Sequence, residues 1–471
     1  MSGGESSGMR SKSKKFRTGL APQQALILPF SLDQWLREDH PARARSELID
    51  QLDLSPILDT YQELRGQPPY DPRIMVKVFV YGYAQGVRSS RRIERALYDD
   101  VAMRWLSGNQ QPDHSRISEF RRRHHEALGN LLVETVRLGK QAGLVGGHDL
   151  SADGSKYKAH ASKHAAMSYA YMEEEEKRLR AAIERGLEEM EQTDRREDAE
   201  YGKDGSGWTL EDDLKFKSRR LERIQKAKAE LEARARAEAE AKADEARANG
   251  KEVKAVDPDK VVVNPKAQYN FTDPESRIMP ASDKKAFIQG YNGQAAVDAE
   301  SMLVVAADVT IQTTDYAALE PLVDQASANL GETPPAVLAD AGYFSKENVA
   351  MLQAKGIAAF IPPERIPHSE WRAQPPAAAP VPEDADAREA MRHRLRTPEG
   401  RRRYKRRQET VEPTFGHLKE VQGQRQELLR GFAKARSMWR FQCAVYNLKK
   451  LVWAGLSANG PLGRQIAPAS A

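Results

Sequence analysis

The spacing of apolar positions divides the chain into helical and strand-like segments. Between residues 26 and 145, apolar residues recur at helical spacing, and serines that suit helix caps and terminal glycines mark several helix ends. The segment DHSRISEFRRRHHEALGNLLVETVRLGKQAG is predicted to form one long helix. The pattern therefore predicts an all-α N-terminal domain.

A longer helical pattern occupies residues 171–255. One stripe of apolar residues includes Met172, Leu179 and Leu187, a turn rich in glycine and aspartate follows, and a second stripe includes Leu221 and Leu231. Charged residues cover the other faces of both helices. The pattern predicts an inserted antiparallel helical hairpin of coiled-coil type. We expect it to be an arm for self-association or for clamping a partner.

Strand-like patterns lie on both sides of this hairpin. DLSADGSKYKA alternates apolar and polar residues before it, and Asp153-Gly154 is expected to break the strand. After the hairpin, QGYNGQAAVDAE and MLVVAADVTIQ predict a pair of antiparallel strands. A helix capped by Thr314 or Asp315, the strand PPAVLADAGYF, the helix SKENVAMLQAKG and the strand IAAFIPP follow. This order matches an α/β ribonuclease-H-like core with a mixed five-stranded sheet.

These patterns define the domain organisation that we expect. The predicted segments are a flexible basic arm (1–25), the helical N-terminal domain (26–145), the first strand of the α/β core (146–170), the inserted hairpin (171–255), the strands and helices of the core (256–365), a loop rich in proline and alanine (366–397), the C-terminal helices of the core (398–456) and a disordered tail (457–471).

Composition places the chain in a reducing compartment away from membranes. The single cysteine, Cys443, excludes an intramolecular disulfide, and no apolar run approaches the ~20 residues of a membrane span. The 73 basic and 68 acidic residues give a formal charge of +5, which is modest, so the distribution of charge matters more than its sum. We therefore expect a cytoplasmic protein.

One predicted helix carries a dense basic cluster near its start. Arg121, Arg122 and Arg123 are consecutive in it. A small helical domain with a basic helix suits docking on DNA. A solvated helix face explains the same residues equally well.

Three carboxylates stand at informative places. Asp340 ends the strand Ala336–Ala339, where it could cap the following turn or serve a site at the sheet edge. Asp153 lies near the end of the first strand, and Glu412 lies in a late basic helix. The first and fourth strands of a ribonuclease-H-like sheet are neighbours, and the helix that follows crosses near their ends. Carboxylates that converge there can hold two divalent ions, Mg²⁺ or Mn²⁺, for phosphoryl displacement.

The surroundings of Glu412 contain a regular set of polar residues. Tyr404, Arg407, Glu412 and Lys419 follow the pattern Y-x2-R-x4-E-x6-K. Glu412 and Lys419 would share a helical face, with Tyr404 and Arg407 bordering it. Pro413 biases Glu412 away from helical geometry, so the helix is expected to begin or kink there. Helical spacing alone does not separate Glu412 from Glu409, one turn earlier.

At this point the chain resembles the DDE transposases of insertion sequences, from about residue 25 to residue 455. DHSRISEFRRRH resembles their helical N-terminal domain, ADGSKYKAHASK their first-Asp motif, LADAGYFSKENV their second-Asp motif, and YKRRQETVEPTFGHLK their Tyr-Arg-Glu-Lys signature. The resemblance implies Asp153, Asp340 and Glu412 as catalytic metal ligands, and it favours Glu412 over Glu409. It also implies Tyr404, Arg407 and Lys419 as contacts to DNA near the scissile phosphate.

The expected function follows from this resemblance. A transposase would bind the terminal inverted repeats of its element, cleave double-stranded DNA and transfer the ends to target DNA, acting as a homodimer or higher homo-oligomer. We expect it in the bacterial cytoplasm, associated with the nucleoid when bound to DNA. Two alternatives are a non-catalytic DNA-binding regulator on the same fold and a nuclease without strand transfer.

Overall fold

The computed structural model describes residues 31–62, 68–200, 208–248, 254–281, 286–365 and 385–455, together with Gly19, Gln24 and residues 375–377. The chain forms two compact units, one from residues 1–160 and 279–471 and the other from residues 161–278. Apart from Gly19 and Gln24, the predicted basic arm lies outside the described residues, as do the predicted tail and most of the loop before residue 385.

The N-terminal part of the first unit is helical, as predicted. Its helices are α1 (Leu32–Trp35), α2 (Pro41–Asp50), α3 (Ser55–Leu58), α4 (Pro72–Ala84), α5 (Ser90–Asp99), α6 (Val101–Leu106), α7 (His114–Arg123) and α8 (His125–Gln141). The prediction of one long helix from Asp113 to Gly143 was wrong, because α7 ends at His124. The backbone there leaves helical geometry (φ −109°, ψ 19°), and the buried His124 ring packs 4.8 Å from the Phe120 ring.

The buried His124 should make stability depend on pH. Burial lowers its pKa to about 4, and the Arg123 guanidinium adds to this effect. Below pH ~6.5 the unfolded chain binds a proton that the folded state does not bind until pH falls to about 4. The free energy of unfolding should therefore fall by about 1–2 kcal/mol between pH 7 and pH 5 on account of this residue. Urea unfolding of the wild type and of His124→Gln at both pH values measures it. An equal pH dependence in the two proteins would contradict the assignment.

The sheet of the first unit contains both antiparallel and parallel strand pairs. The antiparallel pairs lie toward one edge of the sheet and the parallel pairs toward the other. The strands are β1 (Leu150–Lys158), β4 (Arg277–Pro280), β5 (Phe287–Asp298), β6 (Val304–Thr310), β7 (Ala336–Leu338) and β8 (Ala358–Phe360). The order is β4-β5-β1-β7-β8, and β6 pairs with β5. β1–β5 and β5–β6 are antiparallel, whereas β1–β7 and β7–β8 are parallel. The predicted order of strands is confirmed, but this sheet has six strands among the described residues rather than five, because β4 joins it.

The first strand is longer than the sequence predicted. Asp153-Gly154 does not end β1, because β5 continues to pair with it as far as Lys158. The parallel partner β7 pairs with β1 at Leu150 and Ser151. Asp153 therefore lies just beyond this parallel pairing and inside the longer antiparallel ladder.

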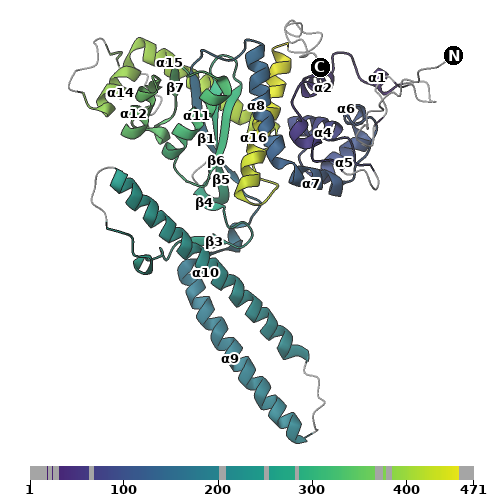
Figure 1. Cartoon of the computed structure of the whole chain (residues 1–471), viewed down its shortest axis with the longest axis vertical. Coiled ribbons are helices and arrows are strands. Elements are labelled where there is room, and N and C mark those ends of the chain that lie inside the picture. The colour runs from purple at the N-terminus through teal and green to yellow at the C-terminus, as the bar shows by residue number, and fades with distance from the viewer. Residues whose placement is uncertain are drawn as a thin grey trace, which may run out of the picture. The chain divides into compact units, whose positions relative to one another are not determined.

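The C-terminal helix α16 (Phe432–Trp453) joins the sheet to the N-terminal helices. Figure 1 shows α16 beside α8, between the sheet and the other N-terminal helices. Asn447 of α16 donates to Thr135 of α8 (3.1 Å), and it bonds both the amide and the carbonyl of Val304 on β6 (2.8 Å each). These bonds satisfy backbone groups of β6 that would otherwise lack partners inside the core.

One prediction about the C-terminal half was wrong, and a second was wrong in part. Residues 366–397 are not all loop, because they include a helix, α14 (Ala387–Arg396). Asp386 caps this helix, and two side chains of the helix are buried. The helix α15 (Pro398–Gly416) does not begin at Glu412, because it starts at Pro398 and Pro413 lies inside it, whereas the predicted kink stays a prediction. Thr414 there donates its hydroxyl to the carbonyl of Thr410 (2.8 Å), and a π-helical turn, His417–Val421, follows. Local bonding of this kind accommodates a proline within a packed helix.

Two further helices cover the sheet of the first unit. They are α11 (Leu319–Leu330), which packs on β6, and α12 (Lys346–Ala354), which packs beside β8. The predicted cap at Thr314 or Asp315 is not made by Asp315, whose side chain makes no cap hydrogen bond at the turn Tyr316–Ala318.

The second unit contains the inserted hairpin. Its long helices α9 (Tyr169–Glu200) and α10 (Trp208–Ala248) lie side by side (Figure 1), and two short strands, β2 (Ala166–Ser168) and β3 (Gln268–Asn270), pair near their base. Glu176 pairs with Lys228 at 2.8 Å, whereas Gly186 lies beside Leu214, so the two helices are antiparallel. Leu187 of the predicted apolar stripe is instead exposed. The coiled-coil character stays a prediction.

Candidate active site

The two predicted aspartates lie together beneath α15. Asp153 is on β1, and Asp340 lies two residues after the end of the neighbouring strand β7. Arg407 of α15 is buried over both carboxylates, with its Nη2 atom 3.0 Å from Asp153 Oδ2 and 3.9 Å from Asp340 Oδ2. Asp340 also caps the turn Ala341–Tyr343 by accepting from the Gly342 amide (2.9 Å). Both predicted roles for this residue are therefore compatible.

The electrostatics of the site reflect several carboxylates in a confined place. Burial raises the pKa of Asp153 to about 6, against the effect of Arg407, and the neighbouring carboxylates of Asp340 and Asp315 raise it further. Arg407 thus compensates only part of the negative charge that gathers here. Carboxylates that remain crowded in this way suit a cation.

Tyr404 and Lys419 face the same carboxylates. Burial raises the pKa of Tyr404, which lies in the fields of Arg407, Asp340 and Asp153. Burial lowers the pKa of Lys419, and Asp153 is the first charge that opposes this shift. The structure therefore places Tyr404 near both aspartates and Lys419 near Asp153, together with Arg407.

Glu412 lies apart from this group. Its side chain is exposed, and it follows Arg407 by five residues, which is about 140° around the helix. Within the described part of the chain, no group of three or more His, Cys, Asp and Glu side chains has a metal-binding arrangement. Glu409 is also exposed and pairs with Lys405 at 3.3 Å. The role of Glu412 as third ligand stays a prediction.

Sequence reasoning missed Asp315 as a residue of this site. Its Oδ1 atom accepts from Asn292 Nδ2 (2.7 Å) and Gln294 Nε2 (2.8 Å), both on β5. Gln294 also accepts a hydrogen bond from the hydroxyl of the buried Tyr343. The sequence does show that Asp315 is a carboxylate shortly after the strand β6, but its position before a predicted helix favoured the interpretation as a helix cap.

The three arginines of α7 have different surroundings. Arg121 is buried and donates to Tyr83 Oη (3.2 Å) and to the Arg88 carbonyl (3.0 Å), so its predicted contact with DNA is corrected to a structural role. Arg122 is exposed and lines a hollow between α5 and α7. The other residues of this hollow are polar: Ser89, Ser90, Arg91, His114, Ser115, Ser118 and Glu119.

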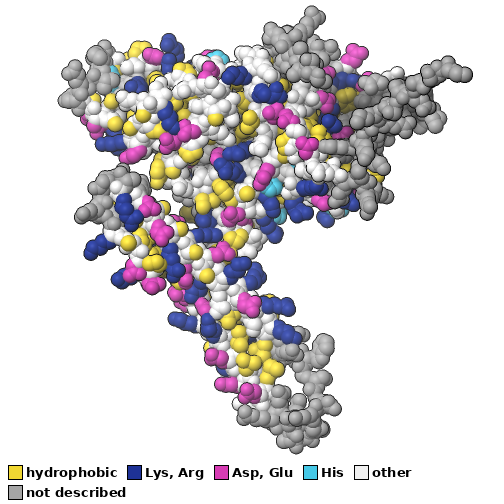
Figure 2. All heavy atoms as spheres, viewed as in Figure 1, with side chains coloured by type: hydrophobic (Ala, Val, Ile, Leu, Met, Phe, Trp, Pro, Cys, Tyr) yellow, Lys and Arg dark blue, Asp and Glu magenta, His cyan; other side chains and the backbone are white. Residues whose placement is uncertain are grey.

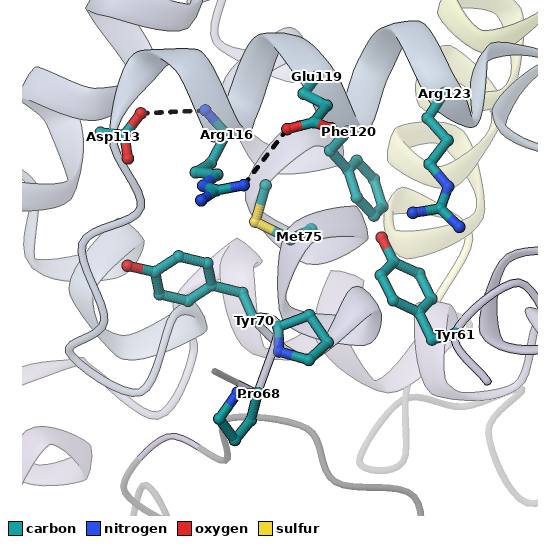
Figure 3. Close-up of a pocket in the computed structure, with 10 residues that line it drawn as sticks. Tyr61, Pro68, Tyr70, Met75, Asp113, Arg116, Glu119, Phe120 and Arg123 are labelled. Atoms are coloured by element: carbon teal, nitrogen blue, oxygen red, sulfur yellow. Dashed lines mark hydrogen bonds and ion pairs between the residues drawn. The ribbon is translucent and has the colours of Figure 1, made fainter. Parts of the chain in front are cut away.

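Arg123 lies on the opposite flank of α7. Figure 3 shows it beside Tyr61 in a second pocket, which Tyr70 and Pro68 also line. Its guanidinium lies 5.0 Å from the centre of the Tyr61 ring and donates to the Thr60 carbonyl (2.9 Å). Figure 2 shows basic and acidic side chains interspersed over the face in view. The individual surroundings of each arginine are therefore more informative than the overall charge.

Aspartates on and just after neighbouring parallel strands of a mixed sheet, beneath a helix with a buried arginine, form a candidate enzyme site. Comparison with protein families agrees with this interpretation. A transposase domain (DUF772) matches residues 30–123, and a transposase DDE domain matches residues 248–448. The chain belongs to the DDE transposases of insertion sequences. No curated protein and no solved structure gave a match.

Membership of this family carries general properties. The chain is an enzyme of transposition, and the family implies a DNA substrate, dependence on divalent metal and a ribonuclease-H-like fold. Among the helices of the described residues, none has the length and apolar character that crossing a membrane requires.

Proposed function

We propose that this transposase binds the terminal inverted repeats of its element, cleaves the DNA at each end and joins the ends to target DNA. The observation that carries the proposal is the placement of Asp153 and Asp340 side by side beneath the buried Arg407, at neighbouring strands of the sheet. Both carboxylates stay partly open to solvent, and burial together with the neighbouring carboxylates raises the pKa of Asp153 to about 6, a combination typical of functional sites.

The donor set fits a metal centre of hard cations. Asp153 and Asp340, with Glu412 as the third ligand, would hold two Mg²⁺ or Mn²⁺ ions. Bound ions would stabilise the attacking and leaving oxygens of an in-line displacement. Tyr404, Arg407 and Lys419 face the same place, where a guanidinium and an ammonium suit the phosphate next to the bond that is cut.

We also propose the finer architecture and assembly. The order β6-β5-β1-β7-β8 supports a ribonuclease-H-like core with five strands and an added β4. Leu187 and Phe216 of the inserted hairpin are 51% and 63% exposed, which supports a coiled-coil arm for a homodimer or higher homo-oligomer. The single cysteine is buried, and burial raises its pKa, in keeping with a cytoplasmic protein that joins the nucleoid on DNA.

Excision in cells tests the proposed function. A marked DNA segment is flanked by the sequences that border this gene and supplied with the protein. Loss of the segment together with its insertion at new sites supports a transposase. Cut ends without insertion would instead show a nuclease, and DNA binding without cutting would show a regulator.

The hollow between α5 and α7 suggests where the N-terminal domain contacts DNA. Arg122→Ala should weaken binding of the end sequences and lower the slope of log affinity against log salt by about 0.9, the value for one lost phosphate contact. Electrophoretic mobility shifts at several salt concentrations measure this. Arg121→Ala should instead lower the free energy of unfolding by about 1–3 kcal/mol, because it leaves buried acceptors unpaired. An unchanged salt slope in Arg122→Ala would contradict the contact.

A further inference from the structure

The carboxylate of Asp315 lies between the two segments that carry the candidate metal ligands. A Cβ atom placed on Gly154, which follows Asp153, would lie 2.8 Å from Asp315 Oδ1 and 2.5 Å from Gln294 Nε2. A Cβ atom on Gly342, two residues after Asp340, would lie 3.2 Å from Asp315 Oδ2 and 3.0 Å from Asp340 Oδ1. A side chain at Gly154 would therefore displace Gln294 and Asp315, and one at Gly342 would fit only tightly beside Asp315 and Asp340.

Two buried amides fix the orientation of this carboxylate. Asn292 and Gln294 both donate to Oδ1, so Oδ2 remains directed toward the Gly342 side. Gln294 accepts from the Tyr343 hydroxyl with its other amide atom. The series of hydrogen bonds from Tyr343 through Gln294 to Asp315 therefore connects the segment after Asp340 to β5. An acceptor at position 315 is what sets the amide of Gln294 in this orientation.

A buried acceptor lies beside Gly154 without a partner. Asn292 is 1% exposed, and its Oδ1 atom has no hydrogen-bond partner among the described residues. This oxygen would lie 3.2 Å from a Cβ on Gly154, on the side that Asp315 Oδ1 also faces. Asn292 pairs with Lys156 across the ladder, whereas Asp153 pairs with Ala295, so this oxygen lies on the opposite face of the sheet from the Asp153 side chain. The open acceptor therefore marks polar space beside Asp315 on that face.

We infer that Asp315 is a positioning residue of the metal centre, which holds the Asp340 segment through Gln294 and adds negative charge beside the cation. The inference rests on the proposed function, because it presupposes ions at Asp153 and Asp340. Asp315 is not placed as a direct ligand, since its Oδ1 is already engaged by two amides. Residues in such outer positions orient ligands and raise metal affinity.

Direct titration of the full-length protein with Mn²⁺, followed by electron paramagnetic resonance, tests the inference without any need for DNA cleavage. Asp315→Asn keeps the size of the side chain and removes its charge. We expect the Kd for Mn²⁺ to rise about 10- to 100-fold, as is usual for outer-position residues. The matched control is Asp50→Asn on α2, which removes an ion pair to Lys77 (2.7 Å) among the N-terminal helices and should leave the Kd unchanged.

The outcomes separate the inference from the proposed function. If the wild type binds Mn²⁺ and Asp315→Asn binds it equally well, the inference is overturned and the metal centre stands. If the wild type does not bind Mn²⁺, the proposed metal centre itself fails. Thermal unfolding shows whether Asp315→Asn remains folded. If it does not, Asn292→Ala replaces it, because this change keeps Asp315 but removes one donor and the unpaired oxygen. A smaller rise in Kd is then expected, and an unchanged Kd overturns the inference.

Discussion

Glu412→Gln is expected to abolish excision, with a loss of at least about 10³-fold, while the protein remains folded. The substitution removes a carboxylate that is exposed on α15. A loss of activity without a loss of stability would therefore identify a ligand that reaches the metal only in the active complex with DNA and cations. The excision of a marked element in cells measures activity, and thermal unfolding of the purified protein measures stability.

Two comparison variants make this result decisive. Glu409→Gln removes another exposed carboxylate of the same helix, one that pairs with Lys405, and should retain excision. Asp340→Ala should lose excision to the same extent as Glu412→Gln. Retained excision in Glu412→Gln together with a loss in Glu409→Gln would transfer the role of third ligand to Glu409.

Trp439→Ala is expected to lower the free energy of unfolding by about 3–5 kcal/mol, the range for a large aromatic side chain removed from a core. Trp439 of α16 is 1% exposed and stacks on Tyr157 of β1, with ring centres 5.3 Å apart and planes 9° apart. Its indole N–H donates to the Gln294 carbonyl of β5 (2.8 Å). The substitution therefore leaves a cavity and an unpaired carbonyl beneath the strands that carry the site. Urea unfolding measures the change.

The same helix supplies a matched control for this second prediction. Trp453 is 66% exposed, so Trp453→Ala should change the free energy of unfolding by no more than about 0.5 kcal/mol. Trp439→Phe should cost less than Trp439→Ala, because a ring remains to stack on Tyr157. Equal losses in Trp439→Ala and Trp453→Ala would contradict the central position of Trp439.

The sequence predicted features that depend on local pattern. The strand before Asp340 is a short apolar run between turn residues, and the hairpin of β5 and β6 has clear alternation. The end of β1 could not be predicted in this way. Asp153-Gly154 is a turn signal on its own, but the partner residues of β5 continue the ladder past it. Tertiary pairing therefore overrode the local preference.

The candidate site shows the same limit on local reasoning. Tyr404, Arg407 and Lys419 could be identified by their spacing and by family resemblance, and they do face the aspartates. The burial of Arg121 depends on Tyr83 of α4, which is 38 residues away in the chain. The position of Asp315 depends on amides of β5 and on two glycines that leave space for it. Both cases depend on contacts between segments that are distant in sequence, and the local sequence patterns around Arg121 and Asp315 do not contain such contacts.

The position of α16 has a consequence for synthesis on the ribosome. This helix, residues 432–453, packs on α8 from the start of the chain and bonds β6 through Asn447. Contacts between segments so far apart in sequence form late, because α16 has to leave the ribosome before it can pack on the earlier segments. The nascent chain should therefore expose its sheet until translation is almost complete. Copies of the gene interrupted before this helix are expected to yield degraded protein rather than a partial competitor for the element's ends.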